Sequence, residues 1–187
     1  MLGVSVVKNP SATGRKDIAD ALGGNINEHS LAIIEGESQT GKSVLCQYLG
    51  YNAISTKRKA VVYYTLEHTA DSLSVQMKSM GMNIEYSING YRFFIQEMIP
   101  AMDLKSSVFC LSAILKSIAR LPAWYKYIIL DTPSSYLLRL NSNTQMKFLM
   151  QLKKLCVNSR SIITVLDTEI MDQPTLSRAR ELSDYYL

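Results

Sequence analysis

The chain has 187 residues, of which 47% are hydrophobic, and its net charge is +4. That length allows one substantial core, so we expect a single domain over residues 1–187, with the first 15 residues partly mobile. The sequence contains no uninterrupted apolar run of about 18 residues and no secretory signal, which favours a cytoplasmic protein. Basic residues cluster only at 57–59 and 153–154, which is too little to indicate nucleic-acid binding. Cys46, Cys110 and Cys156 lack zinc-type spacing and are expected to be packed thiols.

Short apolar runs alternate with helical patterns along the chain. Such runs are typical of strands buried in a parallel sheet, and the patterns between them are typical of amphipathic helices. Strands are expected at 31–34, 60–66, 91–96, 127–131 and 161–166, with another beginning at 184–187. Helices are expected at 44–53, 69–80, 106–121, 144–158 and 174–182. The alternation predicts an α/β fold with a mainly parallel central sheet and helices on both faces.

Residues 36–43 read Gly-Glu-Ser-Gln-Thr-Gly-Lys-Ser, a complete G-x-x-x-x-G-K-S phosphate-binding loop. Its glycines allow a tight turn of amide N–H groups around phosphate oxygens, Lys42 adds a positive charge, and Ser43 offers a hydroxyl to Mg²⁺. A chance Gly/Lys turn is the alternative, but the apolar strand before the loop and the helix after it favour nucleotide binding. The residues expected to contact the nucleotide are Gly36, Glu37, Ser38, Gln39, Thr40, Gly41, Lys42, Ser43 and Val44.

Asp131 ends the apolar strand at 127–131. A carboxylate at the carboxyl end of a parallel strand would lie beside the phosphate loop, where it can hold Mg²⁺ through water together with Ser43. The alternative is an Asp that only caps the turn at 132–133. A phosphate loop without a metal acid would be unusual, which favours the metal role.

A second acid is needed near the metal to position the attacking water. In many phosphate-loop ATPases a Glu directly follows the metal acid, but Thr132 stands there in this chain. Glu67 follows the second predicted strand at the same edge of the sheet and is the better candidate for the catalytic base. The alternatives are a surface Glu and a partner for the dipole of the next helix.

Three further residues have weaker indications of a role. Asp167, at the end of the strand at 161–166, is placed either to sense the γ-phosphate or to cap a turn. Arg178 and Arg180 are placed either to reach the nucleotide of a neighbouring subunit or to lie on the solvated surface of a helix. The solvated surface is the favoured reading of the two arginines.

The segment Asp20-Ala21-Leu22-Gly23-Gly24-Asn25-Ile26, followed by Glu28 and Ser30, resembles the D-x-L-G-G-x-I-x-x-G-S lead-in of the KaiC-like branch of the RecA superfamily. Within that branch the chain is most similar to the accessory ATP-binding subunits of the archaellum, the archaeal swimming filament. The match spans nearly the whole chain and includes the phosphate loop, Glu67 and Asp131. The resemblance implies a RecA-like ATPase fold that binds ATP with Mg²⁺, forms rings, hydrolyses ATP slowly or not at all, and docks on the motor ATPase beneath the membrane.

The chain departs from the family pattern at several positions. His29 stands where the family has Gly, Asn27 where it often has Pro, and Gln39 where a second loop glycine is common. We expect Gln39 to be tolerated if its φ is negative, and phosphate affinity to fall if it is not. Relatives continue with further strands that reach a neighbouring nucleotide, so we expect either a shortened family member or a fragment, with an incomplete intersubunit site.

These observations favour a regulatory ATP-binding switch in the archaellum motor. A recombinase-type DNA-dependent ATPase has the same fold, but it would need basic or Gly-rich loops after the strands, and residues 132–144 contain only Arg139 as a basic residue. A small-molecule kinase would need several arginines around an acceptor pocket, and the region 82–102 has only Arg92.

Overall fold

The computed structural model describes residues 28–55, 59–98, 100, 103–131, 133–158 and 160–187. The expected mobile start of the chain, the lead-in at 20–26 and Asn27 lie outside the described residues. Within the described ranges, none of the helices combines the length and the apolar character needed to cross a bilayer.

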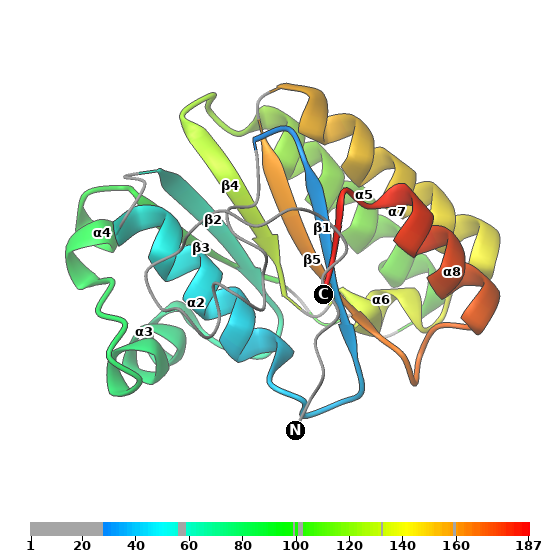
Figure 1. Ribbon diagram of the computed structural model, residues 1–187, viewed down its shortest axis with the longest axis horizontal. Coiled ribbons are helices and arrows are strands. Elements are labelled where there is room, and N and C mark those ends of the chain that lie inside the picture. The colour runs from blue at the N-terminus through cyan, green and yellow to red at the C-terminus, as the bar shows by residue number, and fades with distance from the viewer. Residues whose placement is uncertain (1–27, 56–58, 99, 101–102, 132, 159) are drawn as a thin grey trace.

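The described residues form a six-stranded sheet, all parallel, in the order β3-β2-β4-β5-β1-β6 (Figure 1). The strands are β1 (Leu31–Gly36), β2 (Ala60–Thr65), β3 (Phe93–Glu97), β4 (Tyr125–Leu130), β5 (Ser161–Asp167) and β6 (Tyr185–Tyr186). The predicted parallel α/β fold is therefore confirmed. The strand order differs from the chain order, and it places β5 between β1 and β4.

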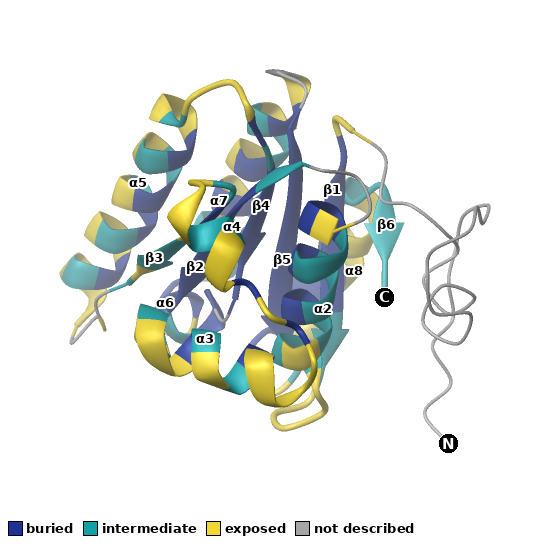
Figure 2. Cartoon of the chain, turned by 90° about the vertical axis from the view of Figure 1, so that its left-hand side faces the viewer, coloured by how far each residue is buried: buried dark blue, intermediate teal, exposed yellow. Residues whose placement is uncertain are grey.

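Helices cover both faces of the sheet (Figure 1). One face is covered by α2 (Lys42–Ser55), α3 (Ala70–Ser79) and α4 (Glu85–Asn89). The other is covered by α5 (Leu104–Arg120), α6 (Ser134–Leu137), α7 (Ser142–Leu155) with the 3₁₀ turn η1 (Cys156–Asn158), and α8 (Gln173–Leu182). Figure 2 shows the central strands buried between helices whose outer sides are exposed.

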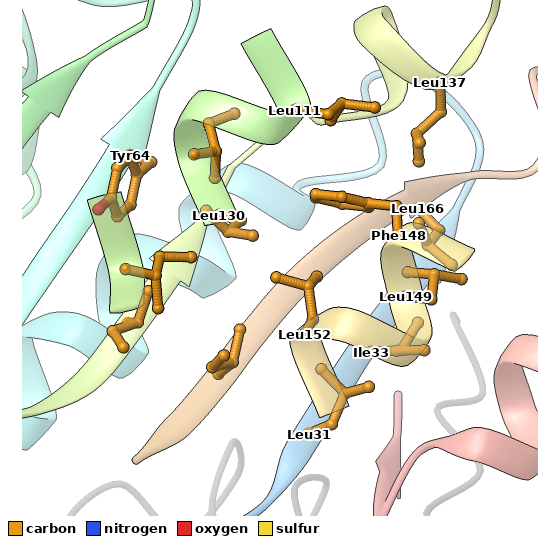
Figure 3. Close-up of a cluster of buried hydrophobic side chains, with 14 of the residues drawn as sticks. Leu31, Ile33, Tyr64, Leu111, Leu130, Leu137, Phe148, Leu149, Leu152 and Leu166 are labelled. Atoms are coloured by element: carbon orange, nitrogen blue, oxygen red, sulfur yellow. The ribbon is translucent and has the colours of Figure 1, made fainter. Parts of the chain in front are cut away.

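The apolar strand runs are continuous because their residues point alternately into two cores. Leu31 and Ile33 of β1 join the core beneath α7, where they pack with Leu149 and Leu152 (Figure 3). Ala32 of the same strand faces the opposite core, beneath α2. Cys46 and Cys156 are buried in these two cores, and Cys110 on α5 is half-buried.

Several predicted boundaries were wrong by a few residues, because capping side chains fix the ends of helices. α5 begins at Leu104 and not at residue 106, since Asp103 accepts the Ser106 N–H at 2.7 Å in a capping box. α7 begins at Ser142, since Asn141 caps it, and it ends at Leu155. β3 begins at Phe93 because Tyr91, with a φ of 55°, still belongs to the preceding turn.

Two short helices were missed by the sequence prediction. α4 lies between Gly81 and β3, and α6 lies in the segment 132–144, which we had interpreted as a loop. α6 has no capping side chain, but its Tyr136 and Leu137 are buried in the core beneath α5 and α7. Tertiary packing therefore stabilises a helix that the local sequence signals poorly.

Candidate functional site

The carboxyl ends of the parallel strands meet at one edge of the sheet, where ligands of open α/β sheets bind. The loop at 36–43 leaves this edge from β1 and enters α2 (Figure 1). Because β5 lies next to β1, Asp167 at the end of β5 pairs in register with Gly36. The topology thus gathers the loop and the ends of β2, β4 and β5 at one edge.

The loop is a tight turn held by its own polar groups. Gly41 has a φ of 88°, which suits glycine, and the Leu45 N–H continues the turn by donating to its carbonyl at 3.0 Å. The Thr40 hydroxyl donates to the Glu37 carbonyl at 2.8 Å. A Cβ at Gly36 would lie 2.9 Å from that hydroxyl oxygen, which is too close, so this turn of the loop requires glycine at position 36.

Gln39 has a φ of 63°, so our condition for its tolerance, a negative φ, is not met. The left-handed region costs a residue with a Cβ about 1 kcal/mol or more relative to its usual conformations. Gln39 is therefore a strained position in the loop. The lower phosphate affinity that we expected in this case stays a prediction.

The Lys42 side chain folds along the loop. Its ammonium donates to the Gly36 carbonyl at 2.7 Å and also to the Glu37 carbonyl, and it lies 3.8 Å from a carboxylate oxygen of Asp167. Only 11% of the side chain is exposed. The loop therefore holds one positive charge against its own backbone carbonyl groups.

Ser43 and Asp131, the two predicted metal residues, are in direct contact. The Ser43 hydroxyl donates to Asp131 Oδ1 at 2.9 Å, and the Tyr63 hydroxyl donates to Asp131 Oδ2 at 2.7 Å. Asp131 is buried, and burial raises the pKa of Tyr63 well above its usual value, so this tyrosine stays a neutral donor. Asp131 is thus held in a fixed orientation beside the loop, and its metal role stays a prediction.

Glu67 follows β2 and is exposed at the wall of a hollow of about 490 Å³. The hollow is also lined by residues of the phosphate loop and of β5 and α6, namely Ser38, Gln39, Gly41, Lys42, Ser43, Val44, Ser134, Val165 and Asp167. Hollows of this size hold small-molecule ligands.

The first turn of α3 takes its capping bonds from Glu97, which accepts the Ala70 N–H at 2.7 Å, and from Thr69. Those bonds weaken our alternative reading of Glu67 as a partner of that helix.

Asp167 caps a turn, as one reading of its position had suggested, and it also contacts the phosphate loop, whereas sensing of a γ-phosphate stays a prediction. Its Oδ1 accepts the Glu169 N–H at 2.9 Å, which is a turn-capping bond. Its Oδ2 accepts the Ser38 hydroxyl of the phosphate loop at 2.9 Å. The carboxylate therefore connects the turn after β5 with the loop.

The two arginines of α8 have different surroundings. Arg178 is exposed. The Arg180 guanidinium donates to both carboxylate oxygens of Glu35, at 3.1 and 2.5 Å, and to the Tyr186 hydroxyl at 3.1 Å. These bonds raise the pKa of Arg180 above its usual range. Arg180 therefore lies on the exposed surface of α8, as we had favoured, but its charge is also paired within the chain.

A family model described as "ATPase: KaiC" matches residues 11–186. The chain belongs to this KaiC family of ATPases. The archaeal flagellar ATP-binding protein FlaH of Methanocaldococcus jannaschii is 29% identical to it over 170 residues, which cover 89% of this chain and 71% of FlaH. The crystal structure of flagellar accessory protein FlaH from the same organism superimposes with a TM-score of 0.71 at 25% identity, over 94% of this chain and 77% of that chain. The resemblance inferred from the sequence is confirmed.

The donors present at this KaiC-family site suit a magnesium nucleotide. Hydroxyl and carboxylate oxygens, which Mg²⁺ prefers, are adjacent at Ser43 and Asp131. The backbone of the loop and the N-terminus of α2 supply N–H groups and a positive dipole end, and Lys42 supplies a full charge. Phosphates and metal would thus find separate and adjacent partners.

Sequence reasoning missed two side chains of the site. Tyr63 was read only as a strand residue, and Ser134, whose hydroxyl accepts the Asp167 N–H at 3.0 Å, was read as part of a loop. Both act through contacts between segments more than 30 residues apart in sequence. Hydroxyl side chains within the strand run at 60–66 were the available signal, but Tyr63, Tyr64 and Thr65 share it, so it did not single out Tyr63.

Proposed function

We propose that this chain is an ATP-binding regulatory component of an archaellum motor complex, a nucleotide-dependent switch with slow or absent hydrolysis. The observation that carries the proposal is the arrangement of Lys42, Ser43 and Asp131 at the carboxyl edge of the sheet. The relationship to FlaH, which is named as a flagellar ATP-binding and accessory protein, supports the motor context. The chain would act as one cytoplasmic domain over residues 1–187.

In this proposal each residue of the site has a separate task. The N–H groups of Glu37 to Val44 and the Lys42 ammonium bind the β- and γ-phosphates of ATP. Ser43 and Asp131 would hold Mg²⁺, which would neutralise phosphate charge. Glu67 orients the attacking water.

The surroundings of Glu67 support slow turnover. Its side chain is exposed at the rim of the hollow, whereas Asp131 is buried and held by two hydroxyl donors. A catalytic base works best when packing and hydrogen bonds hold it at the reacting water. The chain would therefore hydrolyse bound nucleotide poorly, as a switch requires.

The proposed partners are the motor ATPase and other archaellum motor subunits, together with further copies of the chain in a ring that forms with ATP. Contact with the membrane would occur only through those partners.

The structure gives no support to the two alternative functions, a DNA-dependent ATPase and a small-molecule kinase. The segment after Asp131 contains the buried α6, where a DNA-binding loop would need to be open and basic. Arg92 donates to the Ile54 carbonyl at 2.9 Å, away from the site, so it does not serve an acceptor pocket.

The first experiment measures MgATP binding and turnover for the wild type and for Lys42→Ala, Asp131→Asn and Glu67→Gln. We expect tight binding and slow turnover in the wild type, loss of binding in Lys42→Ala, loss of magnesium dependence in Asp131→Asn, and unchanged binding with lower turnover in Glu67→Gln. Asp71→Asn, an exposed charge change in the first turn of α3, is the control. Turnover of tens per second by the isolated chain would contradict the switch.

The second experiment tests the partner. Size-exclusion chromatography with and without MgATP, alone and with the archaellum motor ATPase, should show nucleotide-dependent association for the wild type and none for Lys42→Ala. Salt-sensitive binding of single-stranded DNA with stimulation of ATP hydrolysis would favour the recombinase alternative instead.

A further inference from the structure

The Asp167 carboxylate lies inside the phosphate site itself. It is at the end of β5, directly beside the first residue of the loop, and only 12% of its side chain is exposed. Its Oδ2 atom accepts the Ser38 hydroxyl at 2.9 Å and is 3.8 Å from the Lys42 ammonium. The carboxylate thus approaches two donors of the loop through one oxygen atom.

Those two donors are also the ones that a bound phosphate would use. A phosphate oxygen is an anionic acceptor like a carboxylate oxygen, and Lys42 is the residue that reaches the β- and γ-phosphates in a loop of this kind. Lys42 is largely buried, so its interaction with a nearby anion is weakly screened by solvent. An anion that already lies near Lys42 therefore opposes the entry of another.

We propose that Asp167 competes with the terminal phosphates of the nucleotide for Lys42 and Ser38, and so lowers nucleotide affinity and limits the preference for ATP over ADP. This inference rests on the proposed function as an ATP-binding switch. Because ATP brings one more phosphate to the Lys42 end of the loop than ADP, the repulsion from Asp167 acts more strongly on ATP.

The same carboxylate connects the site to α8. Its Oδ1 accepts the Glu169 N–H, and the Asp167 carbonyl accepts the N–H groups of Ile170 and Met171 at 3.3 and 3.2 Å. This turn leads directly into α8, which begins at Gln173. A change in the position of the carboxylate on phosphate binding would therefore alter the turn that sets the start of α8.

The test compares Asp167→Asn with the wild type by calorimetric titration of MgATP and MgADP. The amide keeps the size and an oxygen acceptor but removes the charge. We expect ATP affinity to rise by about tenfold or more and ADP affinity to rise less. Glu169→Gln, which removes the same charge from an exposed position two residues away, is the matched control and should change either affinity by less than about twofold.

Thermal unfolding of each variant shows whether it is folded, and Asp167→Ser, a smaller neutral side chain with a hydroxyl acceptor, replaces the amide if it is not. Wild-type binding of MgATP without a gain in the neutral variants overturns this inference and leaves the proposed function standing. An equal gain in nucleotide affinity in Glu169→Gln also overturns it, because the gain would then come from the change in net charge and not from the position of Asp167. A neutral variant that binds MgATP where the wild type binds none supports the inference and contradicts the proposed function. Absence of binding in every variant overturns both.

Discussion

Tyr63→Phe removes one hydroxyl from the buried contact that holds Asp131. That hydroxyl donates to Asp131 Oδ2 at 2.7 Å, and the tyrosine ring is fully buried on β2. The next residue provides a matched control. Tyr64 points to the opposite face of the sheet, where its hydroxyl bonds the neutral Ser117 hydroxyl at 2.8 Å. Tyr64→Phe therefore deletes the same atom without affecting a charge.

The expected loss of stability in each variant depends on whether the acceptor of the deleted hydroxyl is charged or neutral. A hydrogen bond to a charged group contributes about 1.5–3 kcal/mol, and a neutral one about 0.5–1.5 kcal/mol. We expect the free energy of unfolding to fall by about 2 kcal/mol in Tyr63→Phe and by about 1 kcal/mol in Tyr64→Phe. For a chain of this length those losses lower Tm by roughly 4–8 °C and 2–4 °C. Only Tyr63→Phe should also weaken magnesium-dependent ATP binding, because only this change frees Asp131 to reorient.

Urea unfolding at neutral pH and ATP titration with and without Mg²⁺ measure the two effects. Burial raises the pKa of Tyr63 well above its usual value, so the phenol stays neutral in these measurements and its ionisation does not contribute to the measured loss of stability. Equal losses of stability in the two variants, with unchanged magnesium dependence in both, would refute the assignment of Asp131 as a residue held in place by Tyr63.

Three further changes test other contacts. Arg180→Ala leaves the buried Glu35 carboxylate without its bidentate partner and should cost about 2 kcal/mol in urea unfolding, whereas Arg178→Ala on the same helix should cost less than about 0.5 kcal/mol. Asp172 caps α8, and its hydrogen bonds lower its pKa below the usual 3.8. The stabilisation that the ionised carboxylate gives to the folded chain is therefore fully present above pH 3.8, and it is lost as the pH falls through the folded-state pKa. The stability difference between the wild type and Asp172→Asn should therefore disappear on acidification below about pH 3.8, and a pH-independent difference would contradict the reasoning. Gln39→Val should weaken ATP binding by about tenfold, since a β-branched residue is poorly tolerated at positive φ, while Gln39→Asn should bind like the wild type.

The strands were predictable because burial on both faces leaves continuous apolar runs such as Tyr127 to Leu130. The phosphate loop was predictable because its geometry demands particular residues at fixed spacing. Helix ends were less predictable, since a cap such as Asn141 could be recognised only once the start of α7 was known. The base role of Glu67 stays a prediction, because the structure tests its position and not its chemistry.

Contacts across the sheet could not be predicted, because strand order is a property of the whole fold. Nothing in the sequence near Asp167 indicates that β5 inserts between β1 and β4. That insertion brings Asp167 to Ser38, 129 residues earlier in the chain. The same holds for Tyr63 and Asp131, which are 68 residues apart. Local patterns therefore identified the loop and Asp131 as the predicted metal acid, and only the topology identified the side chains that contact them.

The pairing of β6 with β1 has a mechanical consequence. The Leu187 N–H donates to the Ile33 carbonyl at 3.0 Å, and the Leu187 carbonyl accepts the Glu35 N–H at 2.9 Å, one residue before the phosphate loop. A force applied at Leu187 would act in shear on these few bonds and then on the strand that supports the loop. A probe or tether attached at this residue would therefore both report on the nucleotide site and disturb it, so attachment elsewhere on the chain is the better choice for binding measurements.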